Sequence, residues 1–315
     1  QRMLFMMEAM DTKNEIVLIT GATGLVGAAL LRHLEGCSVR MLTTNKQAAT
    51  AGNYYYWDPG SGQVDTEAFR DVSVIIHLAG AGIADKRWTP RRKELILQSR
   101  VESLRLIGDI LKQGDHRVRQ LICAGAIGWY GDDPSGTLLF GEEAPPDEHS
   151  FLGRVCREWE AAAFALEELG IAVAVLRTGM VLARQGGALP PIVRSMLTPL
   201  VPVLGSGRQL VSLIHLDDLA AMYIYIMEQR LSGVYNAVAG QVLSHKEMVK
   251  RIARFRKGRA YLCMPVPALV LKIVLGQMAG ELLLSGAAVD NGKIRAAGFV
   301  FRYPDLDDRT LKTLL

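Results

Sequence analysis

Three glycines spaced three residues apart lie near the start of the sequence, in "TGATGLVG". They directly follow the apolar, β-branched run "EIVLIT". Glycine adopts backbone angles that other residues resist, and it lets the main chain approach a bulky anion. The helix expected next would present free N–H groups and a partial positive charge to that anion. The pattern therefore predicts a loop that holds the pyrophosphate of a dinucleotide, with contacts from Gly21, Ala22, Thr23, Gly24, Leu25, Val26 and Gly27.

The end of the second expected strand distinguishes NAD from NADP. An acidic residue about 20 residues beyond the glycines would bind the ribose 2′-hydroxyl of NAD. This chain has "MLTTNKQ" there, without a carboxylate. Thr43 and Thr44 can donate hydrogen bonds to a 2′-phosphate, and Lys46 can neutralise it. We therefore predict NADP as the cofactor, with a solvated role for Lys46 as the alternative.

The usual proton-transfer residues of such enzymes are missing. Hydride transfer to a carbonyl needs a proton donor, which is commonly a Tyr whose pKa is lowered by a Lys four residues later. At that spacing, "FLGRVCREWE" offers Leu152 and Cys156. A Leu side chain cannot transfer a proton, and a thiol does not replace the Lys charge. The segment "CAGAIG" (123–128) also lacks the hydroxyl of a catalytic Ser or Thr.

Other residues could substitute for this apparatus. Tyr130 in "GWYG" follows an expected strand, at the edge of the sheet where ligands bind, and we predict it as the proton donor. The alternative is an aromatic side chain that packs or stacks on a substrate. His77 ends a buried strand, which indicates a structural histidine. His215, with the two aspartates of "IHLDDLA", indicates a helix N-terminus instead of a catalytic set. No residues have metal-ligand spacing, so we predict no metal.

Alternating strands and helices must position these residues. This alternation predicts an α/β fold, with a doubly wound parallel sheet of the Rossmann type. The Gly- and Pro-rich segments after residue 183 indicate loops around a short helix, and "PVPALVLKIV" begins a smaller, mostly helical lobe over the substrate side. The expected strands are 15–20, 38–44, 72–80, 119–128 and 171–182, and the expected helices include 90–112 and 153–170.

The expected domains follow from these elements. The NADP-binding Rossmann domain covers 14–182, and the chain returns to it around 208–240. The substrate-side C-terminal lobe covers 183–207 and 241–315. We expect residues 1–13 to be a disordered leader.

Composition restricts the partners. The chain has 315 residues, half of them apolar and 22% charged, which is typical of a globular protein. Its net charge is +4 and its basic residues are scattered apart from "KRWTPRRK", so we predict a small-molecule substrate and no nucleic acid. The four cysteines lack paired spacing, which indicates free thiols in a reducing cytoplasm.

The most apolar region, 265–289, is interrupted by Lys272 and Glu281. It is therefore too broken to span a membrane, which takes about 18 or more apolar residues in a row. We expect buried helices there. A homodimer contact or a lipid-facing surface is the alternative.

Nine segments in order carry a family resemblance: "ITGATGLVG", "WDPGSGQVD", "HLAGAGIADKRWT", "SRVES", "LRTGMVLARQGGAL", "LGSGRQ", "IHLDDLA", "GELLLSGAAV" and "AAGFVFRYPDL". They resemble the atypical extended short-chain dehydrogenases/reductases, often labelled epimerase family proteins or nucleoside-diphosphate-sugar epimerases. The last two segments resemble the small C-terminal domain of that group. The resemblance runs from about residue 15 to the end of the chain.

The resemblance implies a Rossmann fold that binds NADP(H). Beyond the glycine loop and the two threonines, it implies cofactor contacts from Leu78, Ala79, Gly80, Arg100 and Arg177. The first three end an expected strand, where ligands bind in open parallel sheets. The two arginines could pair with phosphates or with an acidic group of the substrate. The alternative for each is a salt bridge within the fold.

The chain departs from the group at several positions. The group usually has Arg where this chain has Thr44, and Trp where it has Leu213. It generally lacks the Ser and the Tyr-x-x-x-Lys pair, as this chain does. Two hypotheses about function therefore remain. One is an NADP-dependent oxidoreductase or epimerase that acts on a small carbonyl or sugar-nucleotide-like substrate. The other is a non-catalytic NADP(H)-binding sensor or interaction module.

Overall fold

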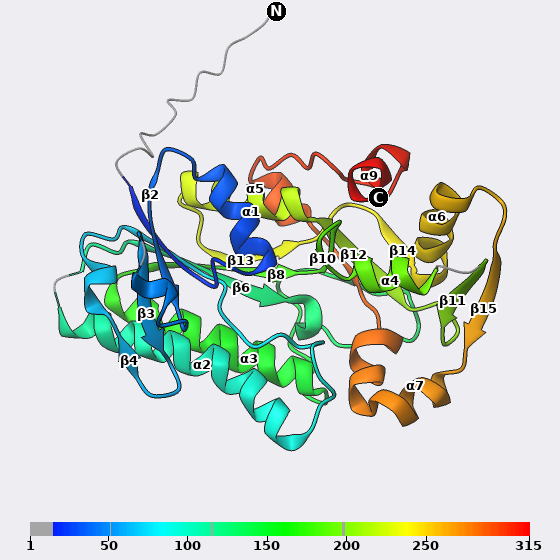
Figure 1. The fold of residues 1–315 in the computed structure, drawn as a ribbon, viewed down its shortest axis with the longest axis horizontal. Helices are drawn as coiled ribbons and strands as arrows, with labels where there is room; N and C mark the ends of the chain where they lie inside the picture. The colour runs from blue at the N-terminus through cyan, green and yellow to red at the C-terminus, as the bar shows by residue number, and fades with distance from the viewer. Residues whose placement is uncertain (1–14, 51, 115, 197–198) are drawn as a thin grey trace, which may run out of the picture.

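A computed structural model describes residues 15–50, 52–114, 116–196 and 199–315. The expected leader at 1–13 lies outside the described residues. A central eight-stranded sheet lies between two layers of helices, and a smaller lobe adjoins one end of this sandwich (Figure 1). The α/β class and the Rossmann-type sheet are therefore confirmed.

The large sheet has the strand order β13-β8-β6-β5-β1-β2-β3-β4. All neighbours are parallel except β3 and β4. From β3 to β8 the parallel strands follow the chain order 3-2-1-4-5-6 of dinucleotide-binding sheets, which places a crevice where the order reverses between β1 and β5. The bounds are β1 (Ile16–Thr20), β2 (Ser38–Thr43), β3 (Tyr54–Asp58), β4 (Gln63–Val64), β5 (Val74–His77), β6 (Gln120–Ala126), β8 (Ala172–Thr178) and β13 (Gly233–Ala237).

Helices cover both faces of this sheet because its central strands are apolar on both sides. Alternate residues of a strand point to opposite faces. Ile19 and Ile76 therefore belong to the core beneath α1 (Leu25–His33) and α5 (Leu216–Glu228). Their neighbours Leu18 and Ile75 belong to the core beneath α2 (Pro90–Gln113) and α3 (Phe151–Phe164). Figure 1 shows the two pairs of helices on opposite sides of the sheet.

The expected single strand 171–182 is wrong. Gly179 separates β8 from β9 (Met180–Ala183), and β9 joins a second sheet of order β10-β9-β12-β14. A Cβ at Gly179 would lie 2.5 Å from the carbonyl oxygen of Ser212, so the backbone segments at Gly179 and Ser212 approach each other at a distance that only glycine permits. The other strands of this sheet are β10 (Gly186–Gly187), β12 (Leu210–His215) and β14 (Val242–Ser244).

The smaller lobe contains both helices and strands. The expected short helix is α4 (Leu189–Ser195), but the loop expected after it includes β11 (Leu200–Leu204), which pairs in parallel with β15 (Leu262–Val266). The remaining elements are α6 (His245–Lys257), α7 (Ala268–Leu275), a π-helical turn (Ala279–Leu284), α8 (Gly292–Ala296), α9 (Asp308–Leu314), and the pair β7 (Leu139–Phe140) and β16 (Ala288–Val289). Short 3₁₀ helices lie at Ala48–Thr50, Thr66–Phe69, Ile127–Trp129 and Ala165–Leu169.

The expectation of buried helices fails for α7. None of its residues is buried, and Leu269 and Ile273 are 69% and 67% exposed. Only its last residue, Leu275, packs partly against the small core around Trp88. In the described part of the chain, no helix combines the length and apolarity needed to cross a membrane.

The C-terminal segment returns to the main sandwich. Ile294 and Phe299 lie in the same core as α1 and α5. The buried carboxylate of Asp218, in the first turn of α5, accepts hydrogen bonds from the backbone N–H groups of Arg302 and Tyr303, each at 2.8 Å. This contact fastens the end of the lobe to the Rossmann layers.

Asp218→Ala is expected to lower the free energy of unfolding by about 2–4 kcal/mol, because it removes the acceptor of two N–H groups, of which that of Tyr303 is buried and that of Arg302 is partly buried. The neighbouring Asp217 is half exposed, so Asp217→Ala is the matched control, with an expected loss of at most about 1 kcal/mol. Urea unfolding followed by circular dichroism measures both. Equal losses would show that Asp218 does not fasten the segment.

Candidate functional site

The glycine loop after β1 has the geometry of an anion-binding turn. Gly21 has a φ of 72°, which favours glycine, and a Cβ at Gly27 would lie 2.5 Å from the carbonyl oxygen of Gly21. Gly24 is the N-cap of α1 and supplies no side-chain hydrogen bond. The first N–H groups of α1, at Leu25 and Val26, are therefore left for an external acceptor.

The turn after β2 lies beside this loop, because β1 and β2 run in parallel with Thr20 opposite Leu42. Thr43 Oγ1 accepts a hydrogen bond from the backbone of Asn45 at 3.1 Å, which tightens the turn. Thr44 and Lys46 are exposed, and the Lys46 ammonium lies 5.1 Å from the centre of the Tyr56 ring. The turn thus offers hydroxyl groups and one cation to the same edge of the sheet.

His77 connects the ends of β1 and β5. Thr20 Oγ1 lies 3.1 Å from the N–H groups of both Leu78 and Ala79 and 2.9 Å from His77 Nδ1. Because this oxygen accepts both amides, its own proton is directed to Nδ1, and Nε2–H then donates to Ser103 Oγ at 3.0 Å. Burial lowers the pKa of His77 to about 3, with Arg100 contributing, so the ring is neutral. The structural role predicted for His77 is confirmed.

Arg100 reaches the same edge from α2. Its guanidinium donates to the carbonyl oxygens of Ala81 (3.1 Å) and Ile96 (2.8 Å) and lies 4.8 Å from the centre of the Trp159 ring. A Cβ at Gly80 would lie 3.2 Å from its Cζ atom. Burial lowers the pKa of Arg100, and it forms no ion pair with any described carboxylate. It holds the loop that begins at Leu78.

Arg177, at the end of β8, is engaged by the protein itself. Its Nε and Nη2 donate to the two carboxylate oxygens of Glu160 at 2.8 and 2.9 Å, and both side chains are buried. Nη1 donates to the carbonyl oxygen of Glu142 at 3.0 Å, and the guanidinium stacks 3.8 Å from the centre of the Trp129 ring. The alternative predicted for Arg177, a salt bridge within the fold, describes this arrangement. Burial raises the pKa of Glu160, and Arg177 opposes that shift.

Tyr130 joins the same buried network. Its hydroxyl donates to Asn236 Oδ1 at 2.7 Å and accepts from Arg177 Nη1 at 3.0 Å. Its ring stacks on Phe140, and the residue is only 4% exposed. Burial raises the pKa of Tyr130, and the Arg177 charge opposes that shift.

The positions of the missing Tyr-x-x-x-Lys pair hold groups that cannot transfer a proton near neutral pH. Leu152 lies in the first turn of α3, and its N–H donates to Glu281 at 2.9 Å. Cys156 is buried, with Sγ 3.5 Å from the carbonyl oxygen of Ala126. Burial, together with the nearby Glu160 carboxylate, raises the pKa of this thiol to about 12.

Two polar residues of this region were missed at the level of sequence. Asn236 lies fully buried in β13 and donates to the carbonyl oxygen of Asp290 at 2.9 Å. Glu142 accepts from the Asn236 N–H at 2.9 Å. The available signal was the polar Asn236 within the apolar strand "VYNAVA", because a buried amide needs partners.

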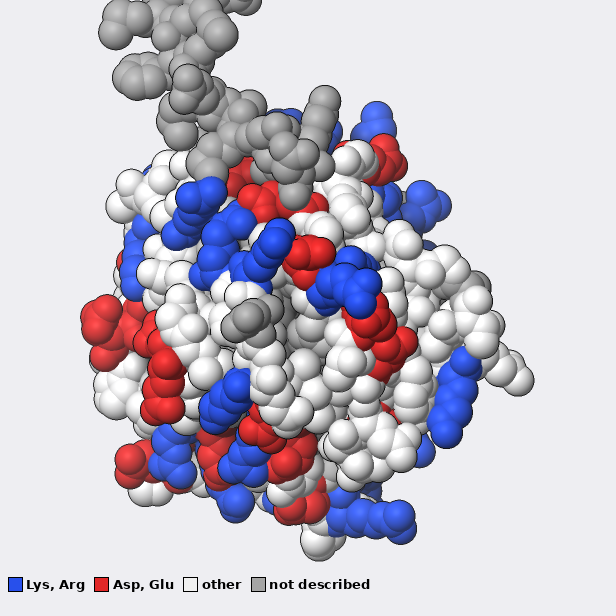
Figure 2. Space-filling model, turned by 90° about the vertical axis from the view of Figure 1, so that its left-hand side faces the viewer, with Lys and Arg blue, Asp and Glu red and all other residues white. Residues whose placement is uncertain are grey.

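His215 is the N-cap of α5, at the helix N-terminus predicted for this segment, and its Nδ1 accepts a hydrogen bond from the Asp217 N–H at 3.1 Å. No cluster of three potential metal ligands occurs among the described residues, and all four cysteines are free. Figure 2 shows basic and acidic side chains interspersed over the face that carries β2, β3 and β4.

The family of the chain follows from comparison with known proteins. Residues 17–238 match the NAD dependent epimerase/dehydratase family, and residues 266–309 match a domain of unknown function, DUF1731. The chain belongs to the NAD dependent epimerase/dehydratase family. The second match covers α7, α8 and the segment as far as residue 309, which is part of the smaller lobe of this epimerase family chain.

Its relatives extend over nearly the whole chain. An epimerase family protein of Staphylococcus saprophyticus, SSP1921, is 32% identical over 92% of this chain and 96% of its own. One from Mycobacterium bovis, Mb2239, is 30% identical over 92% and 94%.

Two solved structures are similar to this fold. The human epimerase family protein SDR39U1, solved with NADPH, has a TM-score of 0.80 and 24% identity, with 95% of this chain and 99% of that chain covered. A nucleoside-diphosphate sugar epimerase from Corynebacterium glutamicum has a TM-score of 0.73 and 27% identity, with 95% of this chain and 58% of that chain covered.

Glu160→Gln is expected to lower the free energy of unfolding by about 3–5 kcal/mol, because it leaves the buried Arg177 charge without its partner. Glu158 lies on the same helix in a surface pair with Arg154, so Glu158→Gln is the matched control and should change stability by at most about 1 kcal/mol. Urea unfolding measures both variants. A loss at Glu160 no larger than at Glu158 would contradict the structural role of the buried pair.

Proposed function

We propose that this chain binds NADP(H) along the C-terminal edge of the large sheet and uses it as an oxidoreductase or epimerase. The observation that carries the proposal is the loop between Gly21 and Gly27, which leaves the N-terminus of α1 without a side-chain cap. The NADPH in the human relative's structure supports the choice of cofactor. The four free cysteines are compatible with a reducing cytoplasm as its location.

Each part of the dinucleotide has matching groups on the chain. The pyrophosphate fits the N–H groups of the glycine loop. The 2′-phosphate fits the turn after β2, where Thr44 and Lys46 are exposed and no carboxylate opposes it. The loop from Leu78 to Gly80 and the guanidinium of Arg100 border the path toward the reacting end. The residues present therefore suit NADP(H) better than NAD.

When bound, the nicotinamide supplies or accepts a hydride. The proposed substrate is a small carbonyl or a sugar-nucleotide-like compound, and the proposed proton donor is Tyr130. Arg177 places a positive charge at the Tyr130 hydroxyl, as the Lys does in the usual Tyr-x-x-x-Lys pair. Since Tyr130 is 4% exposed, this role requires the segment around it to open toward the substrate.

The second candidate function is NADP(H) binding without turnover, as a sensor or interaction module. One specific observation favours it: Leu152 and the buried Cys156 stand where the acid–base pair would be. The same burial of Tyr130 favours a packing role. The two functions share the cofactor site and differ only in the proton path.

Lys46→Ala is expected to weaken NADPH binding about tenfold or more and to leave NADH binding unchanged, because a hydrogen bond to a charged group contributes about 1.5–3 kcal/mol. Nicotinamide fluorescence titration of the purified protein measures both affinities. Lys112→Ala, an exposed lysine at the end of α2, is the matched control and should leave both affinities unchanged. Equal weakening of NADPH and NADH would show that Lys46 does not contact the 2′-phosphate.

Tyr130→Phe is expected to lower the rate of NADPH oxidation at least about a hundredfold, as loss of a general acid does, and to keep NADPH affinity within about twofold. A panel of carbonyl and sugar-nucleotide substrates, followed by absorbance of the reduced nicotinamide, measures the rate. The rate of the wild type should fall at alkaline pH, where Tyr130 loses its proton, and the rate of the variant should not show this fall. Oxidation that persists in the variant would leave Tyr130 as a packing residue, and NADPH binding with no oxidation across the panel would favour the sensor.

A further inference from the structure

One end of the molecule exposes an unusual concentration of large apolar side chains. Twelve such residues are exposed in the described chain, and six of them lie within the thirteen residues from 262 to 274. Single exposed apolar residues are normal, whereas a contiguous patch marks a contact surface. The six are Leu262, Met264, Leu269, Val270, Ile273 and Val274.

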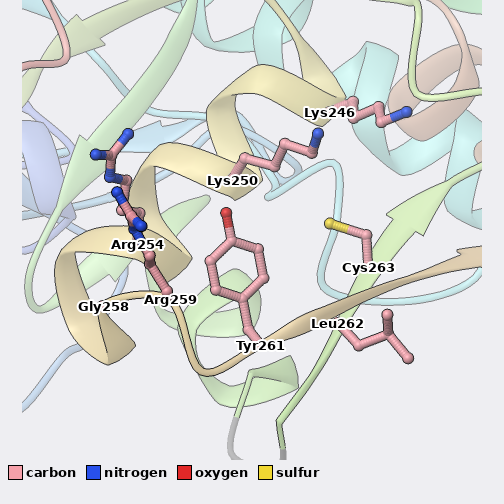
Figure 3. Close-up of a pocket in the computed structure, with 8 residues that line it drawn as sticks. All are labelled: Lys246, Lys250, Arg254, Gly258, Arg259, Tyr261, Leu262 and Cys263. Atoms are coloured by element: carbon pink, nitrogen blue, oxygen red, sulfur yellow. The ribbon is translucent and has the colours of Figure 1, made fainter.

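A basic hollow adjoins these residues. Lys246, Lys250 and Arg254 lie four residues apart along α6, which places them on one face of the helix. With Arg259 and Tyr261 they line a hollow of about 490 Å³. Figure 3 shows Lys250 and Tyr261 reaching toward the same space from opposite sides. None of these four cations forms an ion pair with a described carboxylate.

The hollow and the apolar row adjoin at Leu262, at one end of the molecule. Leu262 borders the hollow and also begins the row. Met264 follows on the same side of β15, because alternate residues of a strand share a face, whereas Cys263 points to the other side and lines the hollow. β15 ends at Val266 and α7 begins two residues later. Figure 1 shows α6, β15 and α7 together at the end of the molecule away from β3 and β4. We call this the α6–α7 surface.

We propose that the α6–α7 surface binds the face of an anionic lipid bilayer. Lipid phosphates would occupy the basic hollow, and the side chains of α7 would enter the boundary between headgroups and acyl chains. Helices that lie on membranes combine these features, an apolar face and nearby lysines and arginines. This mode of binding needs no membrane-spanning helix.

The charges of the surface favour a bilayer over a second copy of the chain. A symmetric dimer through this surface would bring two sets of the same four cations together. Like charges facing each other across an interface oppose association. An anionic bilayer satisfies both halves of the surface at once, since its phosphates pair with the cations and its interior accepts the apolar side chains.

The test uses the purified full chain and cosedimentation with two kinds of vesicle. One kind is phosphatidylcholine alone, and the other is an equimolar mixture of phosphatidylcholine and phosphatidylglycerol. We expect at least about tenfold stronger partition to the anionic vesicles, since each basic residue near such a surface strengthens binding about fivefold. Added salt should weaken this binding. Equal partition to both kinds, or none, would overturn the proposal.

Two pairs of variants locate the contact. Lys250→Glu should weaken binding to the anionic vesicles at least about fivefold, and Arg157→Glu on the exposed side of α3 should not. Ile273→Glu should weaken binding at least about tenfold. Val300, which is 83% exposed and lies outside the α6–α7 surface, provides the control, and Val300→Glu should not weaken binding. All four positions are exposed, so thermal unfolding should show folded proteins. Equal loss in a variant and its control would overturn the proposal.

Self-association is a separate outcome of the same experiment. Light scattering at several protein concentrations measures the oligomeric state of the wild type and of Ile273→Glu. A dimer that Ile273→Glu dissociates, without binding of the wild type to anionic vesicles, would assign the surface to a second copy and overturn the proposal. None of these measurements depends on NADP(H), so they are independent of the proposed cofactor site.

Discussion

A single hydroxyl group holds together the edge of the sheet on which the candidate site depends. Thr20 Oγ1, at the end of β1, accepts hydrogen bonds from the N–H groups of Leu78 and Ala79. It is also hydrogen-bonded to the ring of His77, at the end of β5. These are the two strands between which the strand order reverses. The other ring nitrogen of His77 is hydrogen-bonded to Ser103 in α2. Because the side chains of Thr20, His77 and Ser103 are buried and hydrogen-bonded, the loop after β5 is held beside the glycine turn that follows β1.

The other half of the same edge is closed by a buried polar network. The buried guanidinium of Arg177 is paired with the Glu160 carboxylate, and removing one partner of such a buried pair is strongly destabilising. Tyr130 and Asn236 complete the network, so groups that suggest ligand contacts in the sequence hold the fold together here. The family relationship therefore establishes the fold but not the reaction, since one fold supports many activities.

The smaller lobe presents a different physical problem. Most of its apolar side chains pack beneath α6 and α9, yet α7 stays on the outside. Full burial of one leucine side chain contributes roughly 1.5–3 kcal/mol. Covering the exposed apolar residues of α7 by a binding partner would therefore contribute substantially to the free energy of binding. The basic hollow at the same end of the molecule is the reason that we propose an anionic bilayer as the partner of this helix.

The sequence by itself determined the parallel sheet, the glycine turn and the N-terminus of α5. These are local patterns, in which spacing along the chain reflects the strand and helix periods directly. It also gave the end of β2 without a carboxylate. Only the tertiary structure decided the break at Gly179, the pairing of Arg177 with Glu160 and the exposure of α7. Each depends on how separate segments are arranged in space: Ser212 approaches Gly179, Glu160 reaches across to β8, and the described segments around α7 leave none of its residues buried. Apolar composition indicates that a segment is stabilised by burial, but the tertiary structure decides which other segment, if any, covers it.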